Sequence, residues 1–138
     1  MADVHDKATR SYNMSQIKGK DTKPEILVRK YLFSKGFRYR LHDRKLAGRP
    51  DIVLPKYKTA IFVHGCFWHG HEGCRYFVVP KTRTDWWVAK IEGNRSKDLK
   101  NFHKLSLDGW KVITIFECEL KNREQISITL NAVVSQLR

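Results

Sequence analysis

The sequence predicts a single α/β domain in which helices flank a mixed central sheet. Helical and strand-like segments follow one another along its 138 residues in the order helix, three strands, helix, strand, helix, an order that favours a sheet covered by helices. An apolar content of 41% supports one hydrophobic core, and the chain is too short to build two comfortable cores. The order of the strands stays open.

The first helix is predicted over residues 22–35. Thr22-Lys-Pro-Glu25 has the form of a capping box with proline in the first turn, and Gly36 marks the end of the helix. Between them, apolar residues recur at helical spacing: Leu27, Val28, Tyr31 and Leu32.

Three short strands follow. Residues 37–41 alternate between apolar and polar side chains, and Gly48-Arg-Pro50 breaks the chain before a strand at 51–54. A turn then leads into the β-rich run at 59–63, so the last two strands form a predicted hairpin.

This hairpin brings polar groups together at one end of the sheet. Folding it about residue 57 places Asp51 opposite Val63, next to His64. A carboxylate therefore meets the backbone around Val63 and His64, an arrangement that suits a metal ion.

The second half of the chain begins without a clear pattern. Residues 64–87 are rich in Gly, His, Cys and aromatic residues but lack periodicity, whereas residues 94–107 have helical character that ends near Gly109. Residues 111–116 form a predicted strand. A closing amphipathic helix is marked by Ile126, Leu130, Val133, Val134 and Leu137.

The charge of the chain points to a polyanionic partner. Lys and Arg number 27 against 14 Asp and Glu, a formal net charge of +13. Aromatic residues are interleaved with the basic ones, which favours a nucleic acid over an ordinary basic surface, although charge alone does not separate DNA from RNA.

Residues 1–20 are predicted to form a basic arm outside the main core, which residues 21–138 build. Met14 and Ile17 are the sizeable apolar residues in the middle of this arm, and on a helix they would share one face. An arm lying on DNA could use them as wedges between base pairs. A frayed terminus without function is the alternative.

The sequence favours the cytoplasm. No stretch approaches the roughly 20 apolar residues of a membrane span, and the N-terminus has no apolar signal region. The cysteines, which number three, argue against a disulfide framework and fit a reducing compartment or a metal site.

A structural zinc site is predicted from cysteine and histidine spacing. Cys66, His71 and Cys74 follow the pattern Cys-x4-His-x2-Cys, and Cys118 stands just beyond the strand at 111–116. Zn²⁺ favours tetrahedral sulfur and nitrogen donors, and four protein ligands leave no position open for water. The ion would anchor an irregular loop to the far strand.

Two alternatives to this ligand set stay open. The cysteines could be buried free thiols that behave as small hydrophobic residues. His64 and His69 are rival nitrogen donors, although the spacing to Cys74 favours His71.

A second metal site is predicted at the start of the hairpin. Hydrolysis of a phosphodiester needs a cation to offset developing charge, a base to activate water, and help for the leaving oxygen. Asp51 and the main-chain carbonyl of Val63 could suffice for Mg²⁺, which takes few protein oxygens and keeps several waters.

Three further residues are catalytic candidates. His69 and His64 titrate near neutrality in their ordinary state and could serve as general base and as a contact to phosphate or the leaving group. Glu25 shares the core-facing stripe of Val28 and Leu32, so it could point toward the hairpin or simply complete the capping box.

These residues lie within motifs that closely resemble the very-short-patch-repair (Vsr) mismatch endonucleases. The similarity runs from residue 1 to about residue 120, and its most specific part is GRPD followed by HGCFWH. The matching segments are residues 1–11, Gly48–Asp51, Phe62–His69, Thr82–Thr84, Gly109-Trp110 and Glu117-Cys118.

The resemblance implies a restriction-endonuclease-like fold and a Mg²⁺-dependent nick of double-stranded DNA. The cut would fall on the 5′ side of the thymine in a T:G mismatch, which arises when 5-methylcytosine deaminates. By position, Asp51 resembles the metal carboxylate, His69 the general base, and Glu25 and His64 supporting catalytic residues. The zinc ligands it implies are those given by spacing.

The resemblance also implies residues that contact DNA. Family members insert aromatic side chains beside the mismatch, and Phe67, Trp68 and Trp87 stand at similar positions, with Trp86 as an alternative to Trp87. Two further residues resemble positions that contact the mismatch: Lys90 and Asn94. Met14 and Ile17 match an arm that enters from the minor-groove side.

One departure concerns the second strand, where the wider nuclease superfamily places an acid and a lysine. This chain has Val63 and Gly65 there, so His69 would carry more of the chemistry.

We expect a monomeric bacterial enzyme near the nucleoid, with other mismatch-repair proteins as possible partners. A nuclease that cuts matched duplex, and a zinc-stapled DNA-binding module without catalysis, are the rival interpretations.

Overall fold

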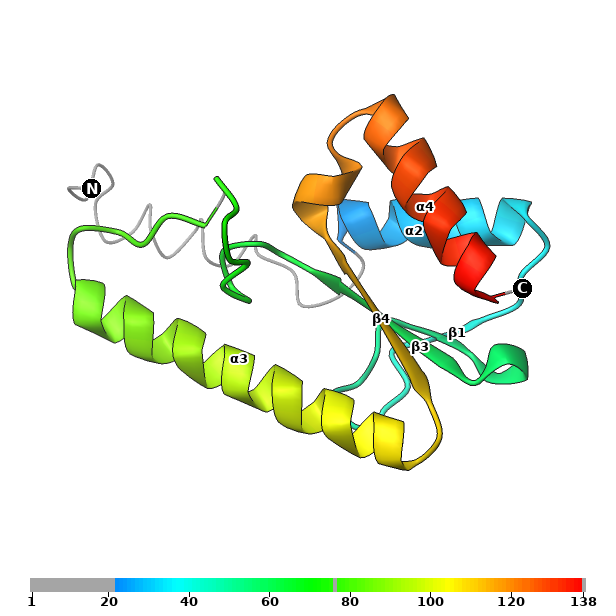
Figure 1. The fold of residues 1–138 in the computed structure, drawn as a ribbon, viewed down its shortest axis with the longest axis horizontal. Helices are drawn as coiled ribbons and strands as arrows, with labels where there is room; N and C mark the ends of the chain where they lie inside the picture. The colour runs from blue at the N-terminus through cyan, green and yellow to red at the C-terminus, as the bar shows by residue number, and fades with distance from the viewer. Residues whose placement is uncertain (1–21, 76, 138) are drawn as a thin grey trace.

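The computed structural model of the chain describes residues 22–75 and 77–137. Helices and strands come in the expected order (Figure 1). In chain order the elements are α2 (Lys23–Ser34), β1 (Arg40–Leu41), β2 (Ile52–Leu54), the 3-10 turn η1 (Pro55–Tyr57), β3 (Thr59–His64), α3 (Thr84–Leu107), β4 (Lys111–Phe116), the 3-10 turn η2 (Glu117–Leu120) and α4 (Arg123–Leu137). The predicted arm at 1–20, with Met14 and Ile17, lies outside the described residues.

The sheet has four strands in the order β1-β2-β3-β4 and is mixed, as predicted. The first three strands pair antiparallel, and β3 pairs parallel with β4. A parallel pair needs a long crossover connection, and the segment containing α3 provides it.

The predicted register of the hairpin is wrong by one residue. Ile52 pairs with Ile61, whereas folding about residue 57 would have placed Asp51 opposite Val63. The difference arises in the turn, where the 3-10 turn η1 is followed by Lys58 in a left-handed conformation with φ of 48°. Asp51 nevertheless reaches Val63 through its side chain.

Helices cover the two faces of the sheet (Figure 1). α2 and α4 pack on one face, where Ile61 of β3 joins the larger hydrophobic cluster. α3 crosses the other face, where Ala60 and Phe62 pack with Leu105. Successive residues of a strand point to opposite faces, so β3 carries core residues on both sides.

The second predicted helix is ten residues longer than expected. α3 begins at Thr84, whereas the sequence suggested a start near residue 94. Its buried residues are Ile91 and Leu105 alone, and Trp86 and Val88 in its first turns are 48% and 42% exposed. The first ten residues of α3 therefore lack the apolar stripe by which a helix is recognised in a sequence.

The first predicted strand is shorter than expected. Only Arg40 and Leu41 pair with β2, because Phe37 turns into the hydrophobic core before the strand begins. The first helix starts as predicted, with the Thr22 hydroxyl accepting a hydrogen bond from the Glu25 N–H. The closing helix α4 also matches its predicted residues.

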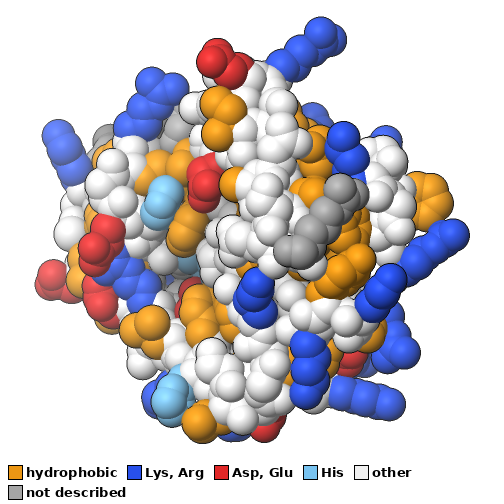
Figure 2. Space-filling model, turned by 45° about the vertical axis from the view of Figure 1, so that its right-hand side comes forward, with side chains coloured by type: hydrophobic (Ala, Val, Ile, Leu, Met, Phe, Trp, Pro, Cys, Tyr) orange, Lys and Arg blue, Asp and Glu red, His pale blue; other side chains and the backbone are white. Residues whose placement is uncertain are grey.

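The face of the molecule seen in Figure 2 carries more basic than acidic side chains. Lys and Arg side chains project around the outline of the molecule, in keeping with the net charge of +13 for the whole chain. Among the described residues, no helix combines the length and apolar character that crossing a bilayer requires.

Candidate functional site

Glu25, His42 and Asp51 form an acidic cluster at the start of the β2-β3 hairpin. They come from α2, the end of β1 and the residue before β2, and one ligand atom of each lies within 4.8 Å of the others. The His42 Nε2 is 3.1 Å from the Glu25 carboxylate, which is 1% exposed and also lies 3.5 Å from the Arg29 guanidinium. The Glu25 side chain thus points toward the hairpin.

Asp51 is hydrogen-bonded to β3, the strand that contains Val63. Its carboxylate accepts a hydrogen bond of 2.7 Å from the Val63 N–H. Burial raises the pKa of Asp51 to about 6, and the nearby charge of Glu25 adds to this rise, while the hydrogen bond from Val63 opposes it. Two carboxylates crowded in a desolvated site favour a proton or a cation between them.

His64, His69 and Asp98 form a second cluster on the α3 side of the sheet. The rings of His64 and His69 stack with centroids 3.6 Å apart and an interplanar angle of 4°. The His69 Nδ1 lies 2.7 Å from the Asp98 carboxylate, which α3 presents to it. An imidazole oriented by a carboxylate in this way keeps its second nitrogen available for proton transfer.

His64 is the buried member of this pair. It is 6% exposed and lies within 6.1 Å of the Phe102 ring, measured between centroids. Burial lowers the pKa of His64 to about 4, and the charge of His69 acts in the same direction. His64 is therefore neutral at physiological pH.

The end of β3 connects the two clusters. Val63 binds Asp51 through its main-chain N–H, and the next residue, His64, stacks on His69. Main-chain N–H groups lie in the plane of a sheet, whereas side chains project from its faces, so one short segment binds a carboxylate through its backbone and presents an imidazole through a side chain.

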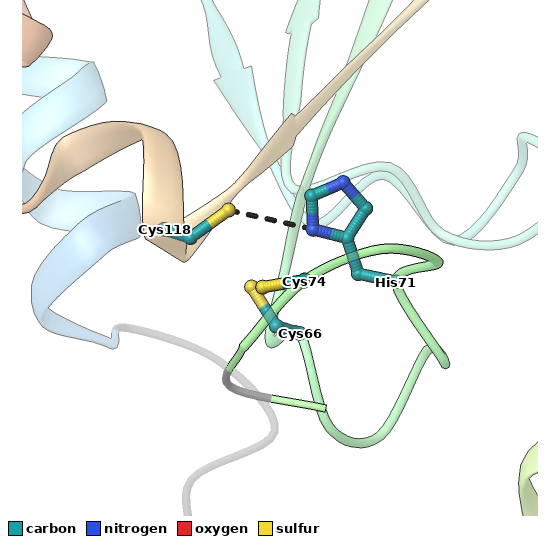
Figure 3. A group of neighbouring side chains, drawn as sticks. All are labelled: Cys66, His71, Cys74 and Cys118. Atoms are coloured by element: carbon teal, nitrogen blue, oxygen red, sulfur yellow. Dashed lines mark hydrogen bonds between the residues drawn. The ribbon is translucent and has the colours of Figure 1, made fainter. Parts of the chain in front are cut away.

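Cys66, His71, Cys74 and Cys118 form a third cluster (Figure 3). The first three come from the loop after β3 and the last from η2, and their ligand atoms lie within 4.8 Å of one another. The Cys118 Sγ is 3.4 Å from the His71 Nδ1, close to the spacing of about 3.6 Å between a sulfur and a nitrogen on tetrahedral zinc. The rival donors His64 and His69 belong to the other cluster.

The loop brings these donors together by local folding. The His71 N–H donates to the Cys66 carbonyl, the Cys74 N–H donates to the His71 carbonyl, and the His71 ring stacks on Phe116 with centroids 3.8 Å apart. Burial raises the pKa of Cys66 to about 12 and also raises the pKa of Cys118. Without a cation these thiols hold their protons at neutral pH.

Aromatic side chains gather beside the histidine pair. Phe67 lies 5.4 Å from Trp87 and 5.2 Å from Trp68, between ring centroids, and Trp68 lies 5.8 Å from Trp87. Trp86 contacts Trp87 and is about half exposed. The three aromatic residues expected from the resemblance are thus neighbours, and Trp86 stands at their edge.

α3 holds the loop that carries these aromatic residues. The Asn94 side chain donates a hydrogen bond of 2.8 Å to the Trp68 carbonyl, and the Arg95 Nε donates one of 2.9 Å to the Gly70 carbonyl. Lys90 is exposed on the same helix. Asn94, expected as a contact to DNA, is therefore engaged with the protein backbone in this structure.

Two residues of these clusters were missed by the sequence analysis. His42 follows β1 directly, and Asp98 is the one acid in the basic stretch 95–104 of α3. Asp98 lies 29 residues from His69, so no spacing rule connects them. The one sign in the sequence that Asp98 has a special role is that it is a single acid among several Lys and Arg residues.

Comparison with known proteins identifies the family. A family model described as DNA mismatch endonuclease Vsr matches residues 2–75. The DNA mismatch endonuclease Vsr of Escherichia coli K12 is 46% identical over 127 residues, covering 92% of this chain and 81% of the relative.

Several nicking enzymes are equally similar over the chain. The type II nicking enzyme V.NmeAIP of Neisseria meningitidis is 49% identical over 138 residues, covering all of this chain and 98% of the relative. V.XorIIP of Xanthomonas oryzae is 45% identical over 125 residues, covering 91% of each chain. These likenesses confirm the resemblance predicted from the sequence, and the chain belongs to the Vsr family of DNA mismatch endonucleases.

Proposed function

We propose that the protein nicks double-stranded DNA on the 5′ side of the thymine in a T:G mismatch by Mg²⁺-dependent hydrolysis. The observation that carries this proposal is the convergence at the end of β3, where Val63 fixes Asp51 and His64 stacks on the His69 that Asp98 orients. A cation-binding carboxylate and an oriented imidazole supply two of the parts that phosphodiester hydrolysis requires, the metal that offsets charge and the base that activates water.

The donor set around Asp51 fits a divalent cation. Asp51 and Glu25 supply hard oxygen donors close together, and their mutual repulsion would fall on binding a positive ion. The main-chain carbonyl of Val63 is the third protein donor that we propose. Bound Mg²⁺ would offset the negative charge that develops on the phosphate.

His69 acts as the general base. The Asp98 carboxylate accepts the hydrogen bond of the His69 Nδ1–H, which leaves the Nε2 lone pair free to take a proton from the attacking water. Asp98 then stabilises the imidazolium that forms. As the water oxygen bonds to phosphorus, the bond from phosphorus to the deoxyribose oxygen breaks, and that oxygen takes a proton from solvent and leaves as a hydroxyl group.

His64 supports this reaction as a neutral group. Its stacked position against His69 places a hydrogen-bond donor beside the base, without a second positive charge that would oppose protonation of His69. We assign it a contact to the phosphate or to the leaving oxygen.

The aromatic cluster and the basic surface bind the DNA. We propose that Phe67, Trp68 and Trp87 insert beside the mismatch, where stacking contributes roughly 1–3 kcal/mol per base. Lys90 and Asn94 of α3 would contact the mismatch, Asn94 after exchanging its bond to the Trp68 carbonyl for one to a base. We also propose that residues 1–20 are a DNA-contacting arm, with Met14 and Ile17 as wedges, and that residues 21–138 form the endonuclease domain.

The cysteine cluster fits a structural Zn²⁺ ion. Three sulfur atoms and one imidazole nitrogen form a set that zinc favours, and four protein ligands leave no open position for catalysis. When bound, the ion fixes the loop after β3 to η2, and so the backbone from which Phe67, Trp68 and His69 project.

A nicking assay on synthetic duplexes tests the proposal. Zinc-loaded protein with Mg²⁺ should cut the T strand of a T:G duplex and leave the matched T:A duplex intact, and omission of Mg²⁺ should stop the cut. Asp51→Ala and His69→Ala should each abolish nicking, whereas the matched exposed controls Asp108→Ala and His103→Ala should nick like the wild type.

Two results would contradict the proposal. Equal cutting of matched duplex would indicate a restriction-type nuclease instead. Nicking that survives alanine at both Asp51 and His69 would remove the catalytic assignment altogether.

A further inference from the structure

We propose that His42 is a nitrogen ligand of the divalent cation held by Glu25 and Asp51, and that this ligand makes the site bind Mn²⁺ in preference to Mg²⁺. The inference rests on the proposed function, since it concerns the same cation site. It goes beyond that function by adding a donor of a different chemical kind.

The geometry of the cluster fits three donors on one ion. Ligand atoms on an octahedral Mg²⁺ lie about 2.0–2.1 Å from it, so adjacent donors are about 2.9 Å apart and opposite donors about 4.2 Å apart. The His42 Nε2 and the Glu25 Oε2 are 3.1 Å apart, and all three donors lie within 4.8 Å of one another. A small approach would bring them onto a common cation.

The backbone at His42 aims its ring at this cluster. His42 has a φ of 51°, a left-handed conformation that non-glycine residues adopt infrequently. Its N–H donates a hydrogen bond of 3.1 Å to the Asp51 carbonyl, so the turn after β1 is tied to the residue that carries the metal carboxylate. About a quarter of the His42 side chain is exposed, whereas its Nε2 atom is buried and lies toward Glu25 inside the cluster.

A purely structural ion pair is the simplest rival explanation. His42 could serve only to offset the buried charge of Glu25, but the Arg29 guanidinium already lies 3.5 Å from the same carboxylate oxygen. Arg29 stays charged at any physiological pH, whereas an imidazole can turn a lone pair toward a cation. The residue type therefore suits coordination better than charge compensation.

The chemistry of the donor determines the metal preference. Carboxylate and water oxygens suit both Mg²⁺ and Mn²⁺, whereas an imidazole is a ligand for transition metals. A nitrogen donor therefore adds affinity for Mn²⁺ but little for Mg²⁺, which also sheds its waters reluctantly. A site with two carboxylates and one imidazole should therefore bind Mn²⁺ more tightly than a site that lacks the imidazole.

The experiment uses full-length, zinc-loaded protein, so that the cysteine cluster is already occupied when Mn²⁺ is added. Electron paramagnetic resonance measures the dissociation constant, and electron spin-echo modulation reports whether a histidine nitrogen is bound to Mn²⁺. Wild type should show nitrogen coupling. His42→Gln should lose the coupling and bind Mn²⁺ at least about tenfold more weakly, while Mg²⁺ binding changes by less than about threefold.

A matched histidine variant assigns the nitrogen. His69→Gln removes an imidazole from the neighbouring cluster, so it should leave the nitrogen coupling and the Mn²⁺ affinity as in the wild type. Loss of coupling in His69→Gln with retention in His42→Gln would overturn the inference. Absence of coupling in the wild type would overturn it as well, and needs no variant to fold.

Asp51→Asn separates failure of this inference from failure of the proposed function. If Asp51→Asn abolishes Mn²⁺ binding but His42→Gln keeps the nitrogen coupling, only the role of His42 is wrong. If Asp51→Asn binds Mn²⁺ like the wild type, the cation site itself is wrong, and with it the proposed chemistry.

Discussion

Replacing Asp98 by Asn removes the charge that faces His69 while keeping the shape of the side chain. The two groups lie 2.7 Å apart, and their side chains are 22% and 27% exposed. At an effective dielectric constant of about 20, a charge pair at this distance is worth about 6 kcal/mol, and partial solvent screening reduces this to about 3 kcal/mol. That is the stabilisation an imidazolium at His69 would lose.

A loss of about 3 kcal/mol corresponds to about a 10²-fold lower rate of strand scission. An Asn can also present its amide to the imidazole and favour the wrong tautomer, a fault that costs up to about 10⁴-fold in hydrolases with an Asp-His pair. We therefore expect Asp98→Asn to slow nicking between about 10²- and 10⁴-fold under single-turnover conditions with saturating enzyme. The measured affinity for the duplex should stay near the wild-type value.

The control for this measurement is Asp108→Asn. Asp108 is exposed and follows the last residue of the same helix, so its substitution changes the net charge equally without touching His69. If Asp98→Asn nicks within about threefold of Asp108→Asn, the orienting role of Asp98 and the assignment of His69 as general base are both refuted.

Three further predictions concern stability. In zinc-loaded protein without Mg²⁺, Asp51→Asn should raise the free energy of unfolding by about 1–3 kcal/mol at pH 8 and leave it unchanged below pH 4. The pKa of Asp51 is raised to about 6 in the folded chain, so the folded chain binds this proton more tightly than the unfolded chain does. The stability of the wild type therefore falls as the pH rises from about 4 to 6. Urea unfolding at both pH values measures this, and an unchanged difference would contradict it. Cys118→Ser should lower the zinc content and reduce Tm by about 4 °C or more in calorimetry, since each 1 kcal/mol shifts the Tm of a domain of this size by about that amount. Gly70→Ala should lower the free energy of unfolding more than the matched variant Gly73→Ala does in the same urea assay. Both glycines have positive φ, but only a Cβ added at Gly70 would lie 2.5 Å from the Arg95 side chain. Equal losses of stability in the two variants would contradict this prediction.

Local patterns made much of this architecture predictable. The capping residue Thr22 and the helical stripe after it locate α2, and the β-rich runs locate β2, β3 and β4. The cysteine cluster was also accessible, because three of its donors fall within nine residues of one loop. In each case the information lies within a short stretch of chain.

The missed features depend on contacts between distant segments. Asp98 reaches His69 across 29 positions, and His42 meets Glu25 only once β1 and α2 are packed on the same sheet. The first turns of α3 were missed for a related reason, since their aromatic residues pack on the loop before the helix and not on a continuous core. Periodicity cannot report partners of this kind.

The length of α3 fixes how the aromatic cluster and the His69-Asp98 pair are aligned. Trp87 and Asp98 are separated by 11 residues, about three full turns and about 16 Å along one side of the helix, with Ile91 and Leu105 anchoring that side in the interior. The helix thus fixes the distance between these two residues and the direction in which each side chain points. Side-chain exchanges along α3 leave this spacing unchanged. One inserted or deleted residue between Trp87 and Asp98 would rotate the two ends of the helix by about 100° relative to each other, so that Trp87 and Asp98 would no longer lie on the same side.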